Sequence, residues 1–160
     1  MVNKNDLIDY PEVYDIDWFL VSSEQYLIHF SSSGGQIPKL VLESYDYLPI
    51  LNNFFDKLAE ITAAELNPVL KNNKKKFLRK DDSEYLECYK KWATKGFYTF
   101  DKAKDNMPIN NEYHLVAHPQ KPMQIDLFPN DIKEILRKLQ LGASIKGINS
   151  INLSEFPQLW

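Results

Sequence analysis

Residues 15–35, DIDWFLVSSEQYLIHFSSSGG, contain two apolar, aromatic-rich runs separated by a short polar turn. The runs, residues 16–22 and 25–31, have the length and composition of strands, so they predict a β-hairpin. Polar and apolar residues alternate in the second run, as they do when one face of a strand is buried. The first run is apolar on both faces, which predicts a strand inside the sheet rather than at its edge.

Helix signals follow this hairpin. An apolar stripe at three- and four-residue spacing predicts a helix from Pro49 to Leu66. A second helix is expected to begin near Asp81, where Asp81 and Glu84 fit a capping box, and to end at Gly96. These two helices occupy the middle of the chain.

The second half returns to strand-like sequence. Residues 97–100 and 113–117 predict an antiparallel pair joined by a long loop. A third helix is signalled by Pro129 at its start and Gly142 beyond its end. Alternating apolar residues in 144–153 predict a last edge strand.

The order of these elements favours one α+β domain over residues 1–160. We expect an antiparallel sheet of about four to six strands with about three helices packed on it. With 160 residues and 44% hydrophobic content, the chain has enough apolar surface for a core without metal or disulfides. Cys88 is the only cysteine, so no intrachain disulfide is possible.

The N-terminal sequence is acidic where a signal peptide would be basic and then apolar. No run approaches the roughly 18 consecutive apolar residues of a membrane span. The sequence therefore predicts a cytoplasmic protein without a membrane partner. Its net charge of −3 disfavours nucleic acid as the default partner.

No metal or other cofactor is expected. His114 and His118 lie four residues apart in strand-like sequence, a separation of about 13 Å. Two ligands of one zinc ion must each approach the metal to about 2 Å, so this spacing argues against a shared site. A mid-helix Cys88 beside Glu87 lacks the cation or helix N-terminus that activates a thiol.

Two functions stay open as alternatives to protein binding: an enzyme and a nucleic-acid binder. Asp17, His29 and His118 would form the site of a small hydrolase-like enzyme if the fold brought them together in a cleft. His29 could pair with Asp17 across the hairpin, although a histidine satisfied by a hydroxyl or carbonyl is the more common arrangement. The basic stretch from Lys71 to Lys80 offers a weak nucleic-acid site, but the acids that follow it offset its charge.

The mouth of the hairpin supplies the candidate partner-binding residues. Asp15 and Asp17 point to the same side of a strand, and Ser33, Gly34 and Gly35 form the turn beside them. No catalytic residue is assigned, because neither the serines nor the glycines fit a hydrolase elbow or a phosphate loop.

Three segments carry a family resemblance: IDWFLVSSEQYLIHFSSSGGQIP, KGFYTFD and YHLVAHPQKPMQIDLFP. Their pattern of W-F, an apolar strand, H-F-x-S-x-G-G and proline is similar to that of immunity-type proteins of bacterial contact-dependent and polymorphic toxin systems. The resemblance implies a non-enzymatic cytoplasmic protein that binds and blocks a cognate toxin. Such an inhibitor would expose a broad aromatic and acidic patch, whereas an enzyme would need a deep pocket.

Overall fold

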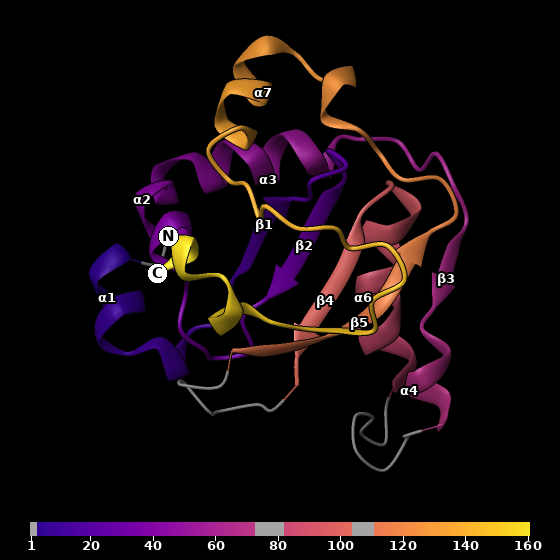
Figure 1. The fold of residues 1–160 in the computed structure, drawn as a ribbon, viewed down its shortest axis with the longest axis horizontal. Helices are drawn as coiled ribbons and strands as arrows, with labels where there is room; N and C mark the ends of the chain where they lie inside the picture. The colour runs from indigo at the N-terminus through magenta and orange to yellow at the C-terminus, as the bar shows by residue number, and fades with distance from the viewer. Residues whose placement is uncertain (1–2, 73–81, 104–110) are drawn as a thin grey trace.

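The computed structural model describes residues 3–72, 82–103 and 111–160 (Figure 1). Its sheet and helices give an α+β fold, as predicted. The described helices and strands are, in chain order, α1 (Lys4–Asp9), β1 (Asp17–Val21), β2 (Leu27–Ser31), α2 (Lys39–Glu43), α3 (Leu48–Asp56), β3 (Ala64–Leu66), α4 (Pro68–Asn72), α6 (Asp82–Thr94), β4 (Tyr98–Lys102), β5 (Glu112–Pro119), α7 (Asn130–Leu136) and β6 (Ser150–Asn152).

The strands form one six-stranded sheet in the order β1-β2-β4-β5-β3, and β6 also pairs with β5. The hairpin is confirmed: β1 and β2 are antiparallel, with Phe19 opposite His29. β2 and β4, however, run parallel, with Ile28 opposite Tyr98, so the sheet is mostly rather than wholly antiparallel. Parallel neighbours need a long crossover connection, which the helices between β2 and β4 provide.

The hairpin is packed on both faces. Phe19 contacts Phe55 of α3 and Trp92 of α6, with ring centroids 4.8 Å and 5.4 Å away. Trp18, which points to the opposite face, stacks on Phe30. In Figure 1 the segment that follows α7 runs across the sheet to the C-terminus. The buried apolar residues of this segment belong to the same core as Trp18 and Phe19.

The prediction that the first strand lies inside the sheet is wrong, because β1 is the terminal strand of the sheet order. Its residues are apolar on both faces because helices and loops cover them. Its outer edge is also partly covered: the amide of Val21 donates to the carbonyl of Leu139 at 2.8 Å, and the amide of Leu141 donates to the carbonyl of Val21 at 2.9 Å.

The predicted helix from Pro49 to Leu66 is too long. α3 ends at Asp56, and Ala64–Leu66 forms β3 instead. The Lys95 ammonium, from beyond α6, donates to the carbonyls of Phe55 and Asp56 at 2.9 and 3.0 Å. Carbonyls at a helix end need partners, and here Lys95 bonds to both, while the Phe55 carbonyl also accepts from the amide of Leu58 at 3.1 Å.

The remaining predicted elements are present. α6 follows the expected second helix, and Gly96 lies beyond its end with a φ of +96°. Asp81, the expected cap, lies outside the described residues. β4 and β5 form the expected antiparallel pair, α7 follows Pro129, and β6 is an edge strand. Three short helices, α1, α2 and α4, were not anticipated.

Candidate functional site

The chain up to the first residue of β1 forms an arm, residues 3–17, which contacts the end of β2 and the turn that follows it. α1 is anchored by Leu7, whose side chain is 2% exposed. The Asn3 side chain caps the helix by accepting from the amide of Asn5 at 3.0 Å. The chain then continues through a short 3-10 turn, Pro11–Val13, to β1.

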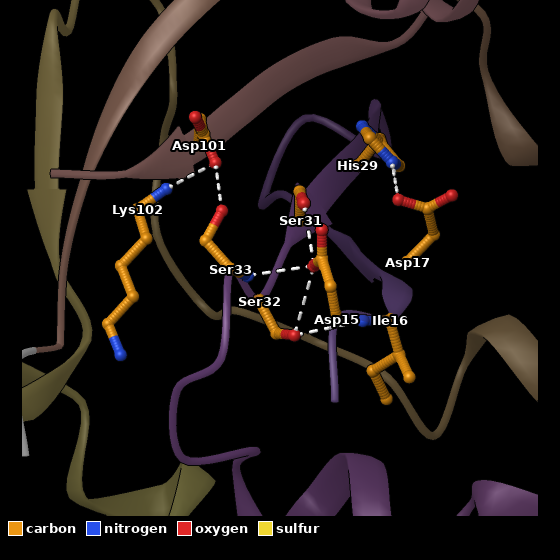
Figure 2. Close-up of polar contacts among 9 residues, drawn as sticks. All are labelled: Asp15, Ile16, Asp17, His29, Ser31, Ser32, Ser33, Asp101 and Lys102. Atoms are coloured by element: carbon orange, nitrogen blue, oxygen red, sulfur yellow. Dashed lines mark hydrogen bonds and ion pairs between the residues drawn. The ribbon is translucent and has the colours of Figure 1, made fainter. Parts of the chain in front are cut away.

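Asp15 fastens this arm to the serine-glycine turn (Figure 2). Its Oδ1 atom accepts from the Ser33 amide at 2.8 Å, from the Ser31 hydroxyl at 3.0 Å and from the Ser32 hydroxyl at 3.3 Å. The Ser32 hydroxyl oxygen also accepts from the amide of Ile16 at 2.9 Å. Two predicted partner residues, Asp15 and Ser33, thus lie in contact, and these bonds hold the arm in place.

The glycines of the turn allow close approach of other groups. Gly34 has a φ of +71°, and a Cβ there would lie 2.7 Å from the carbonyl oxygen of Glu12 in the arm. A Cβ on Gly35 would overlap the side chain of Lys102, which is 2% exposed. Both glycines are therefore required by packing, and Gly34 lies directly against the arm.

Ser33 extends the network into the sheet. Its hydroxyl donates to Asp101 Oδ1 at 2.8 Å, and the Lys102 amide donates to the same oxygen at 2.8 Å. The hydroxyl of Tyr85 donates to the other oxygen of Asp101. Sequence reasoning missed Asp101, although an acid inside the strand sequence YTFDK was a usable signal.

Asp17 and His29 form the pair across the hairpin that the sequence made possible, with His29 Nε2 2.9 Å from Asp17 Oδ1 (Figure 2). The His29 side chain is 2% exposed and Asp17 is 47% exposed. The His29 ring stacks on Trp92 of α6, with centroids 4.9 Å apart. Its Nδ1 atom has no hydrogen-bond partner among the described residues.

His118 does not join this pair. Its Nε2 lies 3.8 Å from Glu65, and its ring stacks with Tyr98. Residues opposite one another in a sheet point to the same face, so His29, Thr99 and Ala117 share one face. Because successive residues of a strand alternate between faces, His118 points to the other face. The structure therefore does not assemble the three residues that the enzyme hypothesis requires.

Two buried phenols stay protonated at neutral pH. Burial raises the pKa of Tyr89, and the Asp101 carboxylate and Tyr85 raise it further. Burial also raises the pKa of Tyr113, with added contributions from Asp101 and Asp15. Neither phenol can serve as a base near pH 7, and their environment is that of a structural polar network.

The arm exposes apolar side chains that the fold does not bury. Ile8, Tyr10 and Val13 are 53%, 58% and 66% exposed. They lie within six residues of one another, whereas the other large apolar residues exposed in the described chain lie apart, at Ile50, Ile61 and Leu127. Asp9 and Glu12 are exposed between them. We call these five residues, 8–10, 12 and 13, the arm surface.

Sequence reasoning placed the partner site at the hairpin mouth and missed the arm surface beside it. Asp15 and Asp17 continue the acidic side chains of the arm, and both are exposed. The alternation of acids and apolar residues in DLIDYPEVYDID was a usable signal, because apolar residues that fit no strand or long helix often lie at a surface.

A cavity of about 540 Å³ lies between β5, β6 and the C-terminal segment. Glu112, Ser150 and Phe156 are among its lining residues. Asp17, His29 and His118 do not line it, so it gives the enzyme hypothesis no pocket.

Within the described ranges, no group of three or more histidine, cysteine, aspartate or glutamate residues is placed to hold a metal ion. Cys88 is exposed on α6. No helix among the described residues has both the length and the apolarity to cross a bilayer. Only the first two residues of the basic stretch, Lys71 and Asn72, belong to the described structure, at the end of α4, and residues 73–80 lie outside it.

Comparison of the chain with protein-family models, with curated proteins and with solved structures gave no match.

Proposed function

We propose that this chain is a non-enzymatic protein-binding module, an immunity-type inhibitor that binds and blocks a cognate bacterial toxin in the cytoplasm. The observation that carries the proposal is the arm surface: Ile8, Tyr10 and Val13 are each more than half exposed, beside the exposed acids Asp9 and Glu12. Clustered exposed apolar side chains rimmed by polar ones are typical of protein interfaces. This combination of aromatic, apolar and acidic side chains supports the proposal, because an inhibitor is expected to expose such residues.

The anchoring of the arm supports the same function. Leu7 is buried, Gly34 packs against the backbone of Glu12, and Asp15 accepts three hydrogen bonds from the turn. A surface held in this way loses little conformational entropy on binding. Tyr10 suits the centre of such an interface, because tyrosine combines a large apolar ring with a polar hydroxyl.

The polar network at the hairpin mouth has a supporting role in this proposal. Asp15, Ser33, Gly34 and Gly35 position the arm, and Asp17 lies at its end with its carboxylate half exposed. These residues were expected to contact the partner directly. We assign most of the contact to the arm surface, because Asp15 and Ser33 already use their polar atoms within the chain.

The experiment is co-expression with the toxin-like product of an adjacent reading frame, followed by growth measurement and co-purification. The wild-type chain should restore growth and co-purify with the toxin. A variant with Tyr10→Ala and Val13→Ala should fold normally, because both side chains are exposed, and should lose rescue and co-purification.

The matched control is Leu127→Ala, since Leu127 is 75% exposed but lies outside the arm. This variant should rescue growth as the wild type does. If the wild-type chain restores growth against none of the adjacent toxins, the inhibitor function is overturned. Full rescue by the Tyr10 and Val13 variant would overturn the assignment of the arm as the interface.

A further inference from the structure

The arm carries a stronger negative charge than its share of the chain. Residues 3–17 contain five acids and one lysine, Lys4, whereas the whole chain has a net charge of −3. The rest of the molecule is therefore close to neutral. The net negative charge of the chain thus comes from the arm, whereas acids and bases nearly cancel over the remaining residues.

The carboxylates of the arm differ in their availability. Asp15 accepts hydrogen bonds from the serine-glycine turn, and Asp17 pairs with His29. Asp9 and Glu12 are exposed, and their side chains make no hydrogen bond or ion pair within the described structure. In the sequence these two flank Tyr10, the most exposed aromatic residue of the arm.

We infer that the partner of the arm surface is a protein with a cationic face, on which lysine or arginine side chains surround an apolar depression that receives Tyr10. This inference rests on the proposed function and adds the chemistry of the partner to it. Cations would pair with Asp9 and Glu12, while the depression would bury the apolar side chains. An acidic partner would be repelled by the same carboxylates.

Two peptides that match in length and apolar content provide the probe: one alternates lysine with leucine, the other glutamate with leucine. Each is titrated into the ¹⁵N-labelled chain at low salt while the amide signals are followed. The lysine peptide should shift signals from residues 3–17 and from the contacting turn, residues 31–35. The glutamate peptide should shift none of them at the same concentration.

The charge contribution is tested with paired variants. Asp9→Asn combined with Glu12→Gln should weaken binding of the lysine peptide at least tenfold. Asp126→Asn combined with Asp131→Asn is the control, because it removes the same charge from exposed positions near Leu127. The control should bind as the wild type does. Raising the salt from about 0.05 M to about 0.5 M should weaken binding at least tenfold.

Shifts centred outside the arm, equal responses to the two peptides, or equal weakening by both variant pairs would overturn the cationic-partner inference. The toxin assay separates this inference from the proposed function. If Tyr10→Ala with Val13→Ala abolishes rescue while Asp9→Asn with Glu12→Gln leaves both rescue and binding of the lysine peptide unchanged, the inhibitor function stands and the cationic face does not.

Discussion

The arm and the hairpin it leads into distribute polarity in opposite ways. The arm exposes Ile8, Tyr10 and Val13, whereas the region around the hairpin buries His29 and Asp101. Each of these two buried residues has at least one partner: His29 Nε2 bonds to Asp17, and Asp101 accepts from Ser33 and Tyr85. The fold therefore engages both polar residues, but it leaves the three apolar side chains of the arm exposed. This difference is why we propose the arm as the partner-binding surface.

The sharpest way to test this comparison is to truncate one aromatic residue from each region. Phe19→Ala should lower the free energy of unfolding by about 3–5 kcal/mol, because Phe19 is fully buried against Phe55 and Trp92. Tyr10→Ala should change it by less than about 0.5 kcal/mol, as surface substitutions do. Urea unfolding measures both. A large loss for Tyr10→Ala would place that ring in the core.

Asp15→Ala should break the connection between the two regions. It leaves the donors of Ser31, Ser32 and Ser33 without their carboxylate acceptor, so we expect a loss of about 2–3 kcal/mol. Urea unfolding gives the loss, and amide exchange across residues 3–14 shows whether the arm is released. Asp9→Ala serves as the control and should leave both unchanged. Equal stability of the two variants would show that Asp15 does not anchor the arm.

Tyr113→Phe tests the buried polar side of the comparison through pH. Burial, Asp101 and Asp15 raise the pKa of Tyr113, so the folded chain keeps a proton that the unfolded chain releases above about pH 10. The resulting stability is fully present below pH 10 and is lost as the pH rises beyond it, by about 1.4 kcal/mol per pH unit.

The Tyr113→Phe variant should therefore lose stability less steeply than the wild type above pH 10, by about 1.4 kcal/mol per unit. Urea unfolding between pH 8 and pH 11 measures the slopes. Below pH 9 the two curves should run parallel. Parallel curves above pH 10 would contradict the raised pKa.

The smallest expected effect comes from two glycines with matching backbone angles. Gly34 and Gly147 have φ values of +71° and +73°, but a Cβ on Gly34 would meet the carbonyl of Glu12, whereas one on Gly147 meets open space. Gly147→Ala should cost about 1 kcal/mol for the backbone conformation alone. Gly34→Ala should cost about 1 kcal/mol more, because the arm must move. If thermal or urea unfolding gives the two variants the same loss in free energy of unfolding, the arm can move away from residue 34 without a cost in stability.

The sequence predicted the elements whose signals are local. The hairpin, the β4–β5 pair and α7 follow from alternation, helical spacing and nearby turn residues. The end of α3 was misplaced because Lys95, which satisfies its last carbonyls, lies far along the chain. The terminal position of β1 was missed for a similar reason, since residues 139–141 cover its edge.

The sequence allowed part of the contact network at the hairpin to be predicted. Asp15, Ser33 and Gly34 were chosen together, and the structure brings them into one contact region. Their spacing in a hairpin made that closeness foreseeable. The alternation of acids and apolar residues in the arm was a usable signal for a surface segment, but it could not tell which apolar residues are exposed, because neighbours as similar as Leu7 and Ile8 differ completely in burial. Only the path of the chain against the rest of the fold decides which of them points outward.

The parallel pairing of β2 with β4 also determines when the sheet can form during synthesis. Ser33, just after β2, bonds to Asp101 across 68 residues of chain. On the ribosome the hairpin therefore emerges long before β4 and before residues 139–141, so the backbone groups of both its edges are unpaired at that stage. We expect the nascent chain to depend on chaperones at this stage, because unpaired strand edges aggregate. Long-range pairing of this kind also predicts slow refolding for a chain of this size.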